Sequence, residues 1–164
     1  MNLIILIPLV SVLISIVLGL FIALRDIKNP INKLFVWYSS LVVLFLFVEL
    51  GYRAATSYDV AAFFWKIDIF WPIVSGALLH LALVYSGVIK DLKKILPYFL
   101  IYITPVILML IEIFTDLITG APVQDAWGWS FGFPSSLAIG FAVYFWIAIF
   151  HVTTLILFII TSIK

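Results

Sequence analysis

Long apolar runs separated by short polar segments dominate the chain, and Asn29-Pro30 fits the start of a helix, with Asn as cap and Pro in the first turn. Five runs reach a length of about 20 residues, which a helix needs to cross a bilayer. They lack the alternation of a membrane barrel strand. The pattern predicts an all-α, polytopic transmembrane helix bundle, a single domain over residues 1–164 with five spans at about 3–24, 31–52, 63–89, 95–118 and 135–162.

Positive residues divide the predicted loops into two sets. Only Arg53 and Lys66 fall on one side. The other side holds the remaining seven of the nine Lys and Arg: Arg25, Lys28, Lys33, Lys90, Lys93, Lys94 and Lys164. Because short loops rich in Lys and Arg stay in the cytoplasm, we expect an outside N-terminus and a cytoplasmic C-terminus. The chain is then a multi-pass protein of the cell membrane.

Composition excludes several classes of protein. Hydrophobic residues make up 66% and charged residues 10% of the chain, whereas soluble domains carry about 25% charged residues. The high hydropathy also excludes disorder, so the lipid bilayer is the expected surrounding. A net charge of +1 gives no basic field for nucleic acid. With no cysteine there is no disulfide, thiolate metal site or thiol nucleophile.

Ionisable residues gather near the outer ends of three predicted spans. Glu49 and Arg53 have the spacing and order of a helical ion pair. Asp68 and Glu112 lie at similar depth in the third and fourth spans. Ionisable groups in spans usually face the bundle interior or a wet cavity, so they predict an outer vestibule for a small polar ligand or a cation. Alternatively, each reaches interfacial water or is neutralised by Arg53 or Lys66.

Two histidines lie deeper in the predicted spans. His80 and His151 are about 15 and 20 Å from the inner charged ends at 1.5 Å per residue. They could ligate one haem iron, relay protons, contact a ligand, or form hydrogen bonds inside the bundle. We expect them to line the floor beneath the vestibule, with no metal and no cofactor.

The segment before the fifth span has aromatic residues at every second position, Trp127, Trp129, Phe131 and Phe133. This is the period of a strand, and it predicts a short extended segment or hairpin that caps the outer face. Trp127 and Trp129 then either form a lid over the vestibule or belong to the aromatic belt of the membrane interface.

Prolines and small residues suggest how the helices bend and pack. Pro72, which follows the candidate ligand-binding residue Trp71, and Pro105 should kink their helices. The first span carries a ladder of small residues that suits either packing within the chain or a homodimer seam: Ser11, Ser15, Gly19 and Ala23.

Several short motifs resemble the N-terminal seven-helix membrane sensor region of microbial histidine kinases. They are Phe63-Phe64-Trp65 entering the third span, Tyr85-Ser86-Gly87 before a basic turn, the run 49–53, and the Trp-Gly-Trp stretch. The resemblance implies a two-component input region with an outside N-terminus that signals to a cytoplasmic output domain or partner. Five of the seven helices are present, and any kinase activity would lie in a domain absent from this chain.

No catalytic motif is found in the sequence, so we do not expect an enzyme. We expect instead a membrane sensory or signal-input module that detects a small ligand or a membrane state. The alternative is a small transporter or channel subunit that moves an ion or a small solute. A haem protein and a structural subunit of a larger complex are further alternatives.

Overall fold

The computed structural model describes residues 3–89, 95–126 and 128–163. Its elements in chain order are α1 (Leu3–Asp26), α2 (Pro30–Arg53), α3 (Tyr58–Ile67), the 3₁₀ helix η1 (Asp68–Phe70), α4 (Trp71–Tyr85), α5 (Ile95–Phe114), β1 (Gly120–Asp125), β2 (Gly128–Gly132) and α6 (Leu137–Ile163). Within these ranges, five helical segments are long and apolar enough to cross a membrane, with α3, η1 and α4 counting as one. The predicted helical membrane class is confirmed at this level of length and composition.

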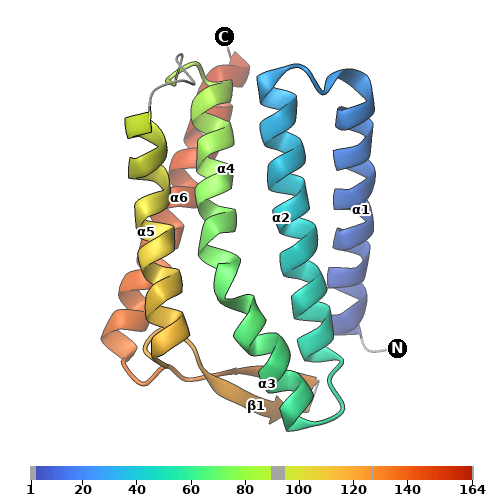
Figure 1. The fold of residues 1–164 in the computed structure, drawn as a ribbon, viewed down its shortest axis with the longest axis vertical. Coiled ribbons are helices and arrows are strands. Elements are labelled where there is room, and N and C mark those ends of the chain that lie inside the picture. The colour runs from blue at the N-terminus through green and yellow to red at the C-terminus, as the bar shows by residue number, and fades with distance from the viewer. Residues whose placement is uncertain (1–2, 90–94, 127, 164) are drawn as a thin grey trace.

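The helical segments run side by side, with α4 at the centre of the bundle (Figure 1). Helix α4 packs against α2, α5 and α6, whereas α1 packs against α2. The β-hairpin lies at the end of the bundle where α1 begins, which we call the hairpin end. The turn between α1 and α2 and the last residues of α6 lie at the opposite end.

The two ends of the bundle carry different sets of basic residues. Arg25, Lys28 and Lys33 flank the turn between α1 and α2 at the opposite end, while Arg53 and Lys66 lie at the hairpin end. The basic residues at 90–94 and Lys164 lie outside the described residues. The direction in which the bundle crosses a membrane stays a prediction.

Capping residues set where two helices begin. The Asn29 side chain accepts a hydrogen bond of 2.9 Å from the Ile31 N–H, and Pro30 occupies the first turn of α2. Ser57 accepts one of 3.4 Å from the Val60 N–H at the start of α3. Because of this cap, the third helical segment begins at residue 58, earlier than the predicted start at residue 63.

The third segment is interrupted next to Pro72, where a kink was predicted, whereas α5 continues as one helix through Pro105. The helix tightens into η1 just before Trp71 and Pro72, since Pro72 has no N–H to continue the α-helical ladder. Helix α5 continues through Pro105, whose buried ring packs on α4. A Cβ atom on Gly76 would lie 3.1 Å from Pro105 Cγ, so a small residue is needed at this crossing.

The aromatic segment forms β2 of an antiparallel hairpin with β1. The prediction of an extended segment or hairpin is therefore confirmed for its described part. Helix α5 ends at Phe114, before the predicted end at residue 118, because the chain there turns toward β1. Gly128, with φ +126°, lets β2 approach the end of α2. A Cβ atom added to Gly128 would lie 2.8 Å from the Arg53 carbonyl oxygen.

Small residues of α1 face α2 of the same chain. A Cβ atom on Gly19 would lie 3.3 Å from the Ser39 Cβ of α2. Ser15 and Ala23 line the same groove between α1 and α2. This ladder brings the two helices close together, as small residues do in membrane bundles.

Candidate functional site

Three carboxylates from different elements come together at the hairpin end. Asp68 opens η1 and is only 6% exposed, and its Oδ1 has no hydrogen-bond partner among the described residues. The carboxylates of Glu49 on α2 and Glu112 on α5 both act on it electrostatically. The structure thus brings the three predicted acids near one another. In the described part of the chain, no group of three or more His, Asp or Glu is arranged to hold a metal ion.

The predicted ion pair on α2 is present. Arg53 Nη2 lies 2.7 Å from Glu49 Oε1, and Arg53 Nε donates to the same oxygen at 2.9 Å. Both side chains are about one-fifth exposed. Arg53 therefore neutralises Glu49, whereas the other two acids of the cluster, Asp68 and Glu112, have no basic partner in the described residues.

The hairpin is fixed over this end by aromatic contacts. Trp129 is 8% exposed, and its indole N–H donates a 3.0 Å hydrogen bond to the Ala55 carbonyl. Tyr52 stacks on Phe131 with ring centroids 4.9 Å apart. Trp129 thus anchors the hairpin rather than facing open space. Trp127, which was expected to act with it, lies outside the described residues.

Trp71 belongs to the packed interior of the bundle. It contacts a buried cluster of three residues. Leu108 belongs to α5, Ile118 to the segment between α5 and β1, and Val143 to α6. This cluster joins three parts of the chain next to the break at η1. Trp71, which was predicted to contact a ligand, therefore packs in the core.

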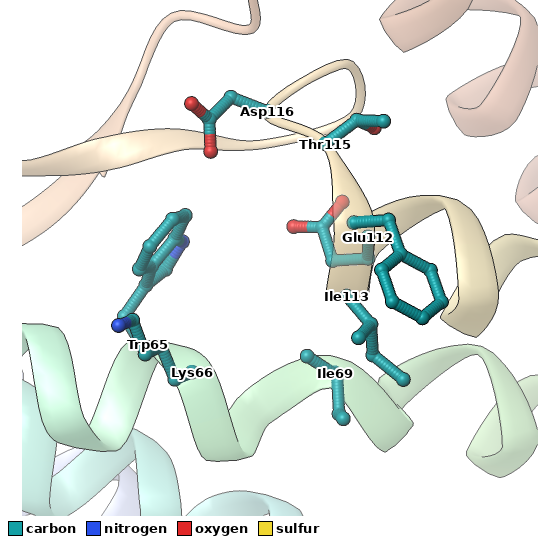
Figure 2. Close-up of a pocket in the computed structure, with 8 residues that line it drawn as sticks. Trp65, Lys66, Ile69, Glu112, Ile113, Thr115 and Asp116 are labelled. Carbon is teal, nitrogen blue, oxygen red and sulfur yellow. The ribbon is translucent and has the colours of Figure 1, made fainter.

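A pocket of about 410 Å³ opens beside the break in the third segment. Figure 2 shows its residues, which come from α3, η1, the end of α5 and the chain after it: Trp65, Lys66, Ile69, Glu112, Ile113, Phe114, Thr115 and Asp116. Of the predicted ligand-binding residues that the structure describes, Glu112 alone lines it. The pocket combines carboxylates, an aromatic wall and apolar side chains.

A chain of hydrogen bonds positions Glu112 in this pocket. The Trp65 indole N–H donates to Thr119 Oγ1 at 3.2 Å, and the Thr119 hydroxyl donates to Glu112 Oε1. Glu112 Oε2 is buried and has no hydrogen-bond partner among the described residues. One oxygen of Glu112 is therefore engaged, and the other lies buried without a hydrogen-bond partner in the described part of the chain.

Sequence reasoning missed Trp65, Thr119 and Asp116 as site residues. Glu112 lies on α5, whereas Asp116 follows the end of this helix at Phe114, so helical spacing does not account for their meeting at the pocket. Trp65 and Thr119 are 54 residues apart in the chain, so no local pattern joins them.

His80 and His151 lie in different surroundings, and neither lines the pocket. His80 is 5% exposed, and its Nδ1 is 3.2 Å from the Tyr102 hydroxyl. Its Nε2 has no hydrogen-bond partner among the described residues. His151 is exposed on α6, with Nδ1 2.9 Å from the Ile147 carbonyl. One ring is enclosed and the other faces outward.

Comparison of the chain with protein-family models, with curated proteins and with solved structures found no match. Nothing in these comparisons identifies a histidine kinase sensor region, so this resemblance stays a prediction.

Proposed function

We propose that the chain is a membrane signal-input module, in which a small ligand enters the pocket beside η1 and changes the packing of the opposite end. One observation carries this proposal. Ile69 of the 3₁₀ break lines the pocket. A ligand there would contact the one place where the third segment departs from α-helical geometry. Short 3₁₀ stretches inside helices often mark hinges.

Helix α4 provides the connection from the break to the opposite end. It begins at Trp71, directly after η1, and packs against α2, α5 and α6. Near its end, Tyr85 contacts Phe158 of α6, with ring centroids 5.5 Å apart. A ligand that prefers one arrangement of the break would shift the population of α4 positions, and α6 would follow. A cytoplasmic output domain or partner would read this shift.

A pocket-filling substitution tests this proposal without a known ligand. The chain has no cysteine, so spin labels can be attached at Lys28→Cys and Ser162→Cys, both at the opposite end. In lipid nanodiscs, we expect Ile69→Trp to shift the label-to-label distance distribution measured by pulsed electron resonance. Val123→Trp, on an exposed hairpin residue outside the pocket, is the matched control and should leave it unchanged.

Ile113→Trp fills the pocket from α5 and replaces Ile69→Trp if that variant does not fold, because Ile113 is about half exposed and tolerates a larger side chain. A shift with either folded pocket variant, absent in the control, supports the proposal. Unchanged distances in a folded pocket variant would overturn it.

Transport of an ion or small solute is a second candidate, and the environment of Asp68 favours it. A buried acid with a free oxygen at a broken membrane helix is a common feature of ion pathways. We expect ion flux into proteoliposomes that Asp68→Asn abolishes if the chain is a transporter or channel subunit. Absence of flux with Na⁺, K⁺ and H⁺ gradients would dismiss this candidate.

A further inference from the structure

We propose that the pocket beside η1 selects a small organic ammonium ion with a short apolar or aromatic tail. This inference rests on the proposed function, because it names the ligand class of the same pocket. The unpartnered oxygen of Glu112, the charge of the lining and the aromatic and apolar walls favour such a ligand.

Glu112 Oε2 needs a hydrogen-bond donor. It is buried, and no described residue bonds to it. Thr119 already engages Oε1, so the direction of the carboxylate is fixed. An unpaired buried acceptor is destabilising, and more so when it is charged. An ammonium group entering the pocket would supply both the donor and the opposite charge, in the strongest class of hydrogen bond.

The charge of the lining favours a cation. Counted by formal charge, Glu112 and Asp116 contribute two negative charges and Lys66 one positive charge, so the lining has a formal charge of −1. Lys66 is exposed to solvent, so its charge is better screened than that of the buried Glu112 oxygen. A carboxylate or phosphate ligand would meet two acids here. The lining therefore discriminates against anions.

The walls favour an organic cation over a metal ion. Figure 2 shows the indole of Trp65 bordering the same space as the carboxylates of Glu112 and Asp116. A cation near the face of an indole is attracted by the electrons of its ring. Ile69, Ile113 and Phe114 offer apolar contacts to a tail. A volume of about 410 Å³ lies in the range of small-molecule sites, whereas the acids do not form a metal-ligand group within the described ranges.

Titration calorimetry of the full chain in nanodiscs of zwitterionic lipid tests this inference, with empty nanodiscs as blank. The probe is phenethylammonium, and 2-phenylethanol is its neutral analogue of similar shape. We expect saturable binding of phenethylammonium, and at least tenfold weaker binding of the alcohol and of 3-phenylpropionate. Glu112→Gln keeps an acceptor for Thr119 but removes the charge, and should weaken the amine at least tenfold.

Asp59→Asn is the matched control, since Asp59 is an exposed acid at the start of α3 that does not line the pocket. It should change the affinity less than twofold. If Glu112→Gln does not fold, Asp116→Asn takes its place, with an expected weakening of about threefold. Equal binding of the alcohol, no saturable amine binding, or an unchanged affinity in both pocket variants would each overturn the inference.

The two proposals can fail separately. If the amine does not bind while Ile69→Trp shifts the spin-label distances, the ligand class is wrong and the signal-input function stands. If the amine binds through Glu112 while neither pocket-filling variant shifts those distances, the ligand class stands and the signal-input function is wrong.

Discussion

Replacing Gly128 by alanine should loosen the hairpin from the end of α2. Gly128 has φ +126°, and an added Cβ atom would lie 2.8 Å from the Arg53 carbonyl oxygen. Gly87 offers a matched control, because it has φ +74° but no atom within 4 Å of an added Cβ. Both substitutions strain the backbone, and only the one at Gly128 also creates a clash.

Each substitution has a cost in stability that follows from its local geometry. At Gly87, alanine in the left-handed region costs about 1–2 kcal/mol. At Gly128, a backbone conformation that is essentially restricted to glycine costs about 1–3 kcal/mol. The clash adds about 1–3 kcal/mol of overpacking, since a backbone carbonyl cannot rotate away as a side chain could. The sum for Gly128→Ala is therefore about 2–6 kcal/mol.

Hydrogen exchange of the amides in β1 and β2, measured in nanodiscs, reports this loss directly. Every 1.4 kcal/mol changes an equilibrium constant tenfold, so a loss of 2 kcal/mol lowers hairpin protection roughly thirtyfold. Gly87→Ala lies at the opposite end and should leave hairpin protection unchanged. Hairpin protection within threefold of the unsubstituted chain in Gly128→Ala would refute the reasoning.

Three further outcomes are expected. Trp129→Phe removes the donor to a backbone carbonyl and should cost about 1–3 kcal/mol in thermal unfolding; an unchanged transition would mean that this hydrogen bond does not hold the hairpin. Tyr102→Phe removes the hydroxyl beside His80 Nδ1 and should cost about 1 kcal/mol in the same assay; a more stable variant would contradict the contact. Single cysteines at Lys28 and Val123 should react with impermeant thiol reagents from the cytoplasmic and outer sides, respectively, and the reverse labelling would invert the predicted orientation.

Much of the helical architecture could be predicted because it depends on composition and local spacing. The Glu49–Arg53 pair followed from a four-residue separation, and the hairpin from aromatic residues at period two. The cap at Ser57 was missed because the polar residues after it contradict the apolar pattern of a membrane span. Local side-chain chemistry decided that helix start.

The candidate site could be predicted only in part. The pocket forms where Trp65 meets Thr119 and where Glu112 faces η1, and these contacts join distant segments. The orientation of His151 was equally hidden, because α6 is apolar around its whole circumference and gives no periodic signal for its inner face. Such features depend on how the helices rotate against one another.

The long chain separation between Ala55 and Trp129 also sets the order in which the molecule can be assembled during synthesis. Helix α1 has its packing partner as soon as α2 is made. The end of α2 must wait for β2, which follows it by 74 residues. At 5–20 residues per second, Tyr52 and its buried neighbours remain uncovered for about 4–15 s after they are made. During this interval the hairpin end is open to chaperones, to lipid and to other nascent chains.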